Sequence, residues 1–189
     1  MVTDTRPDQP LSSSMTKSLS SSGEAASAER AFGLAIARDG SWWHEGAPIR
    51  RLELVRLFAS VLRRADDGSY WLVTPVERAR IAVEDVPFVA VELAAAGSGR
   101  AQRLRLRSNL DEWVTVGPEH PLRVRPSAGA GEDDALVPYV EVRPGLEARV
   151  ERAVYYHLVE LGEERDEPEG GSRFGVWSGG RFFALDRAG

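Results

Sequence analysis

A pattern that occurs twice along the chain is the feature that most constrains the fold. Residues 41–73 contain an aromatic strand-like segment, a turn with Gly and Pro, an amphipathic segment, a Gly-bearing connector and a second aromatic segment. Residues 139–185 contain the same kinds of segment in the same order. Such self-similarity indicates that one supersecondary unit is repeated. The sequence therefore predicts a duplicated β-α-β unit, with a β-rich insert between the two copies.

Each copy predicts a helix from the spacing of its apolar residues. In the first copy these residues are Leu54, Val55, Phe58, Val61 and Leu62. In the second copy, Pro144 and Gly162 mark the two ends of the expected helix. Its apolar stripe consists of Leu146, Val150, Ala153, Val154, Leu158 and Leu161. Because the polar residues fall on the opposite side, each helix is expected to bury one face.

The rest of the chain favours strands. Segments rich in β-branched and aromatic residues, separated by Gly, Pro, Asn and Asp, lie at 69–73, 87–93, 103–107, 113–116, 122–124 and 139–142. Residues 74–77 are expected to form an irregular turn, residues 163–172 a mobile acidic loop, and residues 174–185 a hairpin closed by Gly179 and Gly180. The predicted class is α+β, with an antiparallel sheet or partial barrel plus a helix in the second half. The expected division is a tail at 1–28, an α/β domain at 29–83 and a β-rich domain at 84–189.

Composition excludes several classes of protein. The formal net charge is −5, whereas nucleic-acid binding needs a concentrated basic face. The chain has no apolar run of about 18 residues, so no membrane span or membrane partner is expected. The Ser-rich residues 1–28 lack the apolar core of a secretion signal and are expected to be disordered. The absence of cysteine fits a cytoplasmic protein and excludes thiolate metal sites.

His44 and Glu45 form the most tempting catalytic pair. Neighbouring side chains of a strand point to opposite faces, so both reach one atom only if the backbone bends there. The other two histidines, His120 and His157, stand in unrelated segments, so no metal site is expected. No nucleophile elbow, phosphate-binding glycine loop or zinc motif is present. We expect a scaffold role for the pair, no cofactor and no enzymatic activity.

Arg103, Arg105 and Arg107 alternate with leucines, so the three guanidinium groups share one face of a strand. They could bind an anion, but pairing with Glu92 and Glu84 on neighbouring strands is the favoured interpretation. In the second expected helix, Tyr155 and Tyr156 are expected to place at least one hydroxyl at the edge of the core.

Four segments carry a resemblance to a known family. They are GSWWHEGAPIRRLELVRLFASVLRR, YWLVTPVERARIAVEDVPF, PGLEARVERAVYYHLVELG and VWSGGRFFAL. In this order and spacing the chain resembles the bacterial family of domain of unknown function 1285. The resemblance implies a duplicated α/β core, a C-terminal domain like the pleckstrin-homology fold, a small-ligand site at the domain interface and a role in signalling.

The same resemblance implies which residues form that site. They are Arg51, Thr74, Glu77, Asp85, Arg143 and Tyr155, which are expected to line a polar cleft for a small anionic, nucleotide-like molecule. Two other functions stay open. One is a protein-interaction domain that uses a sheet edge and needs no small ligand, and the other is a metal-free enzyme with Glu45 or Glu77 as the base.

Overall fold

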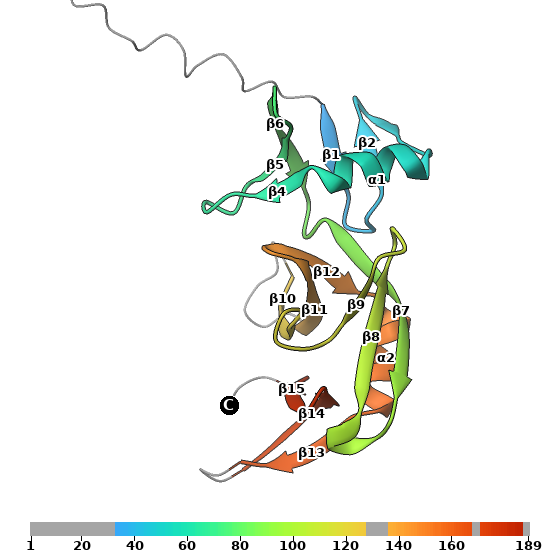
Figure 1. The fold of residues 1–189 in the computed structure, drawn as a ribbon, viewed down its shortest axis with the longest axis vertical. Coiled ribbons are helices and arrows are strands. Elements are labelled where there is room, and N and C mark those ends of the chain that lie inside the picture. Colours follow the sequence, from blue (N-terminus) through green and yellow to red (C-terminus); the bar gives the residue numbers. More distant parts are fainter. Residues whose placement is uncertain (1–32, 128–135, 168–170, 187–189) are drawn as a thin grey trace, which may run out of the picture.

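The computed structural model describes residues 33–127, 136–167 and 171–186. The tail expected at residues 1–28 lies outside the described residues. The described chain is mostly β, with two short α-helices, and its strands form two six-stranded sheets and one three-stranded sheet. Figure 1 shows the first half of the chain at one end of an elongated molecule and the second half at the other.

The first half is one sheet in the order β3-β2-β1-β6-β5-β4. Its elements are β1 (Leu34–Ile36), β2 (Trp42–His44), β3 (Ala47–Pro48), α1 (Leu52–Ser60), β4 (Leu62–Arg64), β5 (Tyr70–Val73) and β6 (Arg78–Val83). β1 and β6 pair in parallel and join two antiparallel three-stranded meanders. α1 buries Val55 and Ala59.

The apolar stripe predicted for this helix continues beyond its observed end. Val61 is the C-cap of α1, and Leu62 belongs to β4, where it pairs with Leu72 and is fully buried. The Leu62 side chain can be buried from a strand as well as from a helix. The spacing of apolar residues alone therefore does not show whether Leu62 belongs to the helix or to the next strand.

The second half contains a six-stranded sheet in the order β10-β11-β12-β7-β8-β9. Its strands are β7 (Phe88–Ala96), β8 (Arg103–Ser108), β9 (Trp113–Thr115), β10 (Leu122–Pro126), β11 (Leu136–Arg143) and β12 (Leu146–Val150), with a short 3-10 turn at Gly99–Ala101. β7 and β12 pair in parallel. This parallel pair departs from the prediction of an antiparallel sheet or partial barrel, whereas the other strand pairs of the sheet are antiparallel. The sheet curls into a half-barrel (Figure 1).

The chain ends in a helix and a small sheet. These elements are α2 (Arg152–Glu160), β13 (Glu163–Asp166), β14 (Ser172–Ser178) and β15 (Arg181–Ala184), and the three strands pair in the order β13-β14-β15. The hairpin predicted at Gly179 and Gly180 is present, with Ser178 opposite Arg181.

Two predictions in this region are wrong. Leu146 and Val150 were expected in a helix but lie in β12, because Gly145, with φ of +73°, turns the chain back so that β12 pairs with β11. The acidic residues 163–166, expected in a loop, form β13 because their backbone pairs with β14 while the side chains stay largely exposed.

The two halves share an order of elements. β2-β3-α1-β4-β5-β6 in the first half corresponds to β11-β12-α2-β13-β14-β15 in the second. The sheets connect differently, because β6 joins the sheet of β1–β3, whereas β13–β15 form a sheet of their own. One continuous cluster of buried apolar residues runs through both halves, from Leu34 to Leu185. No helix in the described part of the chain is long and apolar enough to cross a membrane.

Candidate ligand site at the junction of the two halves

A pocket of about 760 Å³ lies where the two halves meet, and we call it the junction pocket. Its walls are Arg38, Asp39, Val89, Val91, Leu136, Val137, Pro138, Arg149, Val150, Glu151, Arg152, Tyr155 and Tyr156. Arg38 and Asp39 come from the turn between β1 and β2, and the other residues come from β7, β11, β12 and α2. The pocket therefore depends on both halves.

The first turn of α2 forms one wall of the junction pocket. α2 begins at Arg152, and Glu151 is its N-cap without a side-chain hydrogen bond to the first-turn amides. The Glu151 N–H donates to the carbonyl of Ala90 at 3.0 Å, which fixes the start of the helix against β7. First-turn amides and the helix dipole favour a negative group at such a position.

Two tyrosines on α2 add flat surfaces to the same pocket. The Tyr155 ring is half-buried, whereas Tyr156 is 54% exposed. Their ring centroids lie 6.4 Å apart with planes inclined by 34°. Aromatic faces of this kind suit contact with a planar ligand.

Arg149 is a pocket arginine that forms an ion pair with a buried carboxylate. Its guanidinium lies 3.8 Å from the Asp85 carboxylate, whose side chain is only 1% exposed. The Tyr139 hydroxyl donates to both oxygens of that carboxylate, at 2.9 and 3.2 Å. Burial and the hydrogen bond to Asp85 raise the pKa of Tyr139 to about 12. Asp85 therefore does not line the pocket itself and is linked to it through Arg149.

Arg143 links the two halves instead of lining the pocket. Its guanidinium donates to the carbonyl of Ala59 at 2.9 Å, at the end of α1. It also pairs with Glu112 at 2.5 Å and stacks over the Phe88 ring. The Arg143 guanidinium, held by these three partners, therefore stabilises the contact between the two halves.

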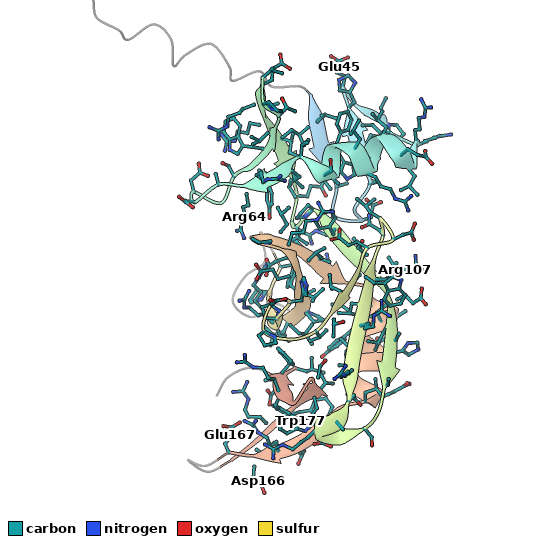
Figure 2. The ribbon with its side chains drawn as sticks, viewed as in Figure 1. Glu45, Arg64, Arg107, Asp166, Glu167 and Trp177 are labelled. Atoms are coloured by element: carbon teal, nitrogen blue, oxygen red, sulfur yellow. The ribbon has the colours of Figure 1, made fainter. Side chains whose placement is uncertain are left out.

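Other contacts across the junction reinforce this link. Arg56 of α1 donates to the carbonyl of Leu110 at 3.1 Å and forms an ion pair with Asp111. The Asn109 side chain donates to the carbonyl of Gly40 at 3.2 Å. Figure 2 shows Arg64 on the side of the first half that faces the second.

Thr74 and Glu77 lie at a different place. The Thr74 hydroxyl donates to the Glu77 carbonyl at 3.1 Å and accepts from the Glu77 N–H at 3.0 Å, which forms the predicted turn. Both residues line a second pocket of about 430 Å³, which we call the α1 groove. Its walls are Leu34, His44, Ile49, Leu54, Phe58, Val61, Leu72, Thr74, Glu77 and Ala79.

The six residues predicted from the sequence thus do not share one cleft. Tyr155 lines the junction pocket, Asp85 contacts its Arg149, and Arg143 binds the halves together. Thr74 and Glu77 line the α1 groove, and Arg51 is exposed at the N-cap of α1. The sequence did not point to Arg38, Arg149, Arg152 and Tyr156 as pocket residues. Arg149 and Arg152 were expected on the water-facing side of a longer helix, whereas the observed helix starts at Arg152.

The remaining candidates are explained by local structure. Glu45 is exposed at a turn with φ of +49°, and Figure 2 places it at the end of the first half that is remote from the second. No cluster of metal-ligating side chains is found among the described residues. Of the arginine row, Arg107 pairs with Glu92 at 2.6 Å as favoured, while Glu84 instead accepts the Arg38 N–H at 2.9 Å.

The molecule is thus mostly β, consists of two halves and has a pocket at their junction. Comparison with known proteins identifies its family. Two family models match it: the domain of unknown function DUF1285, N-terminal domain, over residues 27–86, and the protein of unknown function DUF1285, C-terminal domain, over residues 87–185. The chain belongs to the DUF1285 family. No curated protein matches the chain.

Two solved structures are similar to it. A DUF1285 family protein from Silicibacter pomeroyi DSS-3 is 42% identical, with a TM-score of 0.73 over 82% of this chain and 80% of that one. A DUF1285 family protein from Shewanella baltica OS155 is 26% identical, with a TM-score of 0.52 over 68% of this chain and 91% of that one.

Proposed function

We propose that the protein binds a small anionic, nucleotide-like molecule in the junction pocket. The observation that carries the proposal is the convergence of three arginines, two tyrosines and the first turn of α2 on one pocket of about 760 Å³. Volumes of this size are usual for small-molecule sites. A phosphate would lie at the start of α2, where the first-turn amides and Arg152 both favour negative charge.

The other walls suit the remainder of such a ligand. A base would lie against the faces of Tyr155 and Tyr156, and Arg149, fixed by Asp85, would reach a second anionic group. The hydroxyl of Ser41 hydrogen-bonds Asp39 and lowers the pKa of that carboxyl, so Asp39 stays ionised at neutral pH. Asp39 and Glu151 offset part of the positive charge and are placed to accept hydrogen bonds from ligand hydroxyls.

The finer assignments made from the sequence belong to the same proposal. Six curled strands followed by α2 support a pleckstrin-homology-like second half, and the shared order of elements supports duplication. We propose a binding and signalling role in the cytoplasm, without catalysis and without a cofactor. Binding at a junction suits signalling, because a ligand held by both halves alters the equilibrium between their relative arrangements.

The test is calorimetric and thermal titration of the full chain with a nucleotide panel and with inorganic phosphate. A ligand at 100 times its Kd is expected to add about 2.7 kcal/mol to the free energy of unfolding. Arg152→Gln is expected to weaken binding roughly tenfold, since it removes a charged contact. Arg181→Gln, an exposed arginine on β15, is the matched control and is expected to bind normally. The absence of binding by every compound would contradict the proposal.

One observation favours the alternative of a protein-interaction domain. Tyr156 and Val159, one helical turn apart on α2, are 54% and 36% exposed. This alternative places the docking surface on the helix, whereas the sequence suggested a sheet edge. Under it, the nucleotide panel is expected to leave the unfolding temperature unchanged, so the same titration separates the two functions.

A further inference from the structure

The α1 groove is a second pocket, which the proposed function does not use. It lies within the first half, between one side of α1 and the sheet strands that carry Leu34, Leu72 and Ala79. Its volume of about 430 Å³ is sufficient for a small molecule. It shares no wall residue with the junction pocket.

The groove exposes part of a second apolar stripe of α1, whose Phe58 and Val61 also pack against the edge of the core. α1 buries Val55 and Ala59 in the core. Leu54, Leu57, Phe58 and Val61 follow the spacing i, i+3, i+4 and i+7, which places them on a separate side of the helix. Leu54, Phe58 and Val61 line the groove and are only partly buried. Leu57 continues the stripe toward solvent and is 61% exposed.

The turn that carries Thr74 and Glu77 also holds an exposed apolar residue, which is not itself a wall residue of the groove. Val76 stands between Thr74 and Glu77, which line the groove, and is 88% exposed. Partly exposed apolar side chains in a concavity gain free energy when a ligand removes them from water. The walls therefore favour a ligand with an apolar body.

The charge at the rim of the groove determines which charged group a ligand can carry. Glu77 is the one carboxylate among the described residues that line the groove, and it forms no ion pair with another described residue. The guanidinium of the neighbouring Arg78 lies over the Trp71 ring at 5.0 Å, and Arg78 is not a wall residue of the groove. His44 is the one basic side chain among the described wall residues, which include no arginine or lysine. The rim is therefore complementary to a cation and unfavourable for an anion.

We propose that the α1 groove binds a small amphipathic amine, with its apolar body against Phe58 and Val61 and its ammonium group at Glu77. The site is independent of the junction pocket and of its anionic ligand. The probes are naphthylethylamine and naphthylacetate, which have similar apolar bodies and opposite charges. Isothermal titration of the full chain is expected to show tighter binding of the amine.

Two pairs of variants test the two parts of the proposal. Glu77→Gln is expected to weaken amine binding about 2- to 5-fold, as for an exposed ion pair, and to leave naphthylacetate no weaker. Glu164→Gln, an exposed glutamate on β13, is the control. Ala79→Leu fills the groove and is expected to weaken the amine roughly tenfold or more. Ala82→Leu places the same side chain at an exposed position of the same strand, β6, and is expected to bind normally.

Three results would overturn the assignment. The first is no binding of either probe, and the second is equal binding of both probes with no response to Glu77→Gln. The third concerns the chain itself, since the apolar residue Phe32 stands in the sequence two positions before Leu34, a wall residue of the groove. If the amine binds only to the Phe32→Ala variant, the groove belongs to the chain's own Phe32 and not to a small molecule.

Discussion

At the scale of single residues, the buried pair of Tyr139 and Asp85 is expected to affect both the stability of the protein and its dependence on pH. Tyr139→Phe is expected to lower the free energy of unfolding by about 1–3 kcal/mol, because the buried Asp85 carboxylate loses a donor. Tyr70→Phe is the control, since Tyr70 is also buried but its hydroxyl makes no hydrogen bond with another described residue. Urea denaturation of both variants measures the difference, and equal losses would contradict the assigned role.

The same pair predicts a pH dependence. The pKa of Tyr139 is raised from 10.0 to about 12, so the folded protein retains the phenol proton more strongly than the unfolded chain does. This contribution is complete below pH 10 and is lost as the pH rises from about 10 to 12. The wild type is therefore expected to lose more stability over this interval than Tyr139→Phe, measured by unfolding at each pH. Parallel curves would exclude the assigned pKa.

Residue types alone could predict part of the candidate site. At least one of Tyr155 and Tyr156 was expected at the edge of the core, because an aromatic ring with a hydroxyl favours that position, and Tyr155 is half-buried. That Asp85 contacts Arg149 could not be predicted, because β7 and β12 are far apart in sequence and meet only through their parallel pairing. Thr74 and Glu77 were expected beside Asp85, but the length of β6 separates the turn from the junction.

At the scale of elements, close packing in the last sheet yields a sharp prediction. A Cβ at Gly175 in β14 would lie 2.3 Å from the carbonyl oxygen of Phe183 and 2.8 Å from the Phe182 ring. Gly175→Ala is expected to cost about 1–3 kcal/mol, because the β14–β15 pair must separate. Gly117→Ala is the control, since its added Cβ would make only an ordinary contact of 3.7 Å. Thermal unfolding of both variants checks the difference, and an unaffected Gly175→Ala would contradict the packing.

Elements with a local signal could be predicted, and those defined by distant pairing could not. The hairpin of β14 and β15 has its signal in Gly179 and Gly180, so its register could be read from the sequence. β13 has no local signal, because its Glu, Arg and Asp side chains resemble an acidic loop and only pairing with β14 makes it a strand. β12 was misassigned because Leu146 and Val150 fit a helical stripe as well as one face of a strand.

At the scale of the whole molecule, the core and the polar links across the junction predict how the protein unfolds. The buried cluster is continuous between the halves, and Arg143 and Arg56 each connect α1 to the second half. Calorimetry of the full chain is therefore expected to give one transition with equal calorimetric and van't Hoff enthalpies. Two transitions in the wild type would show that the halves unfold independently.

The polar links can be separated from the shared core. The double variant Arg56→Gln, Arg143→Gln removes the contacts to Leu110, Asp111, Ala59 and Glu112 while leaving the buried apolar residues unchanged. Arg123→Gln is the control, because Arg123 pairs with Glu141 within the second half. The Arg123 side chain is 57% exposed, so its loss is expected to have little effect. If the two arginines couple the halves, the double variant splits the transition and the control does not. A single transition in the double variant would assign the coupling to the apolar core, and the junction pocket would then owe its shape to that core and not to the arginines.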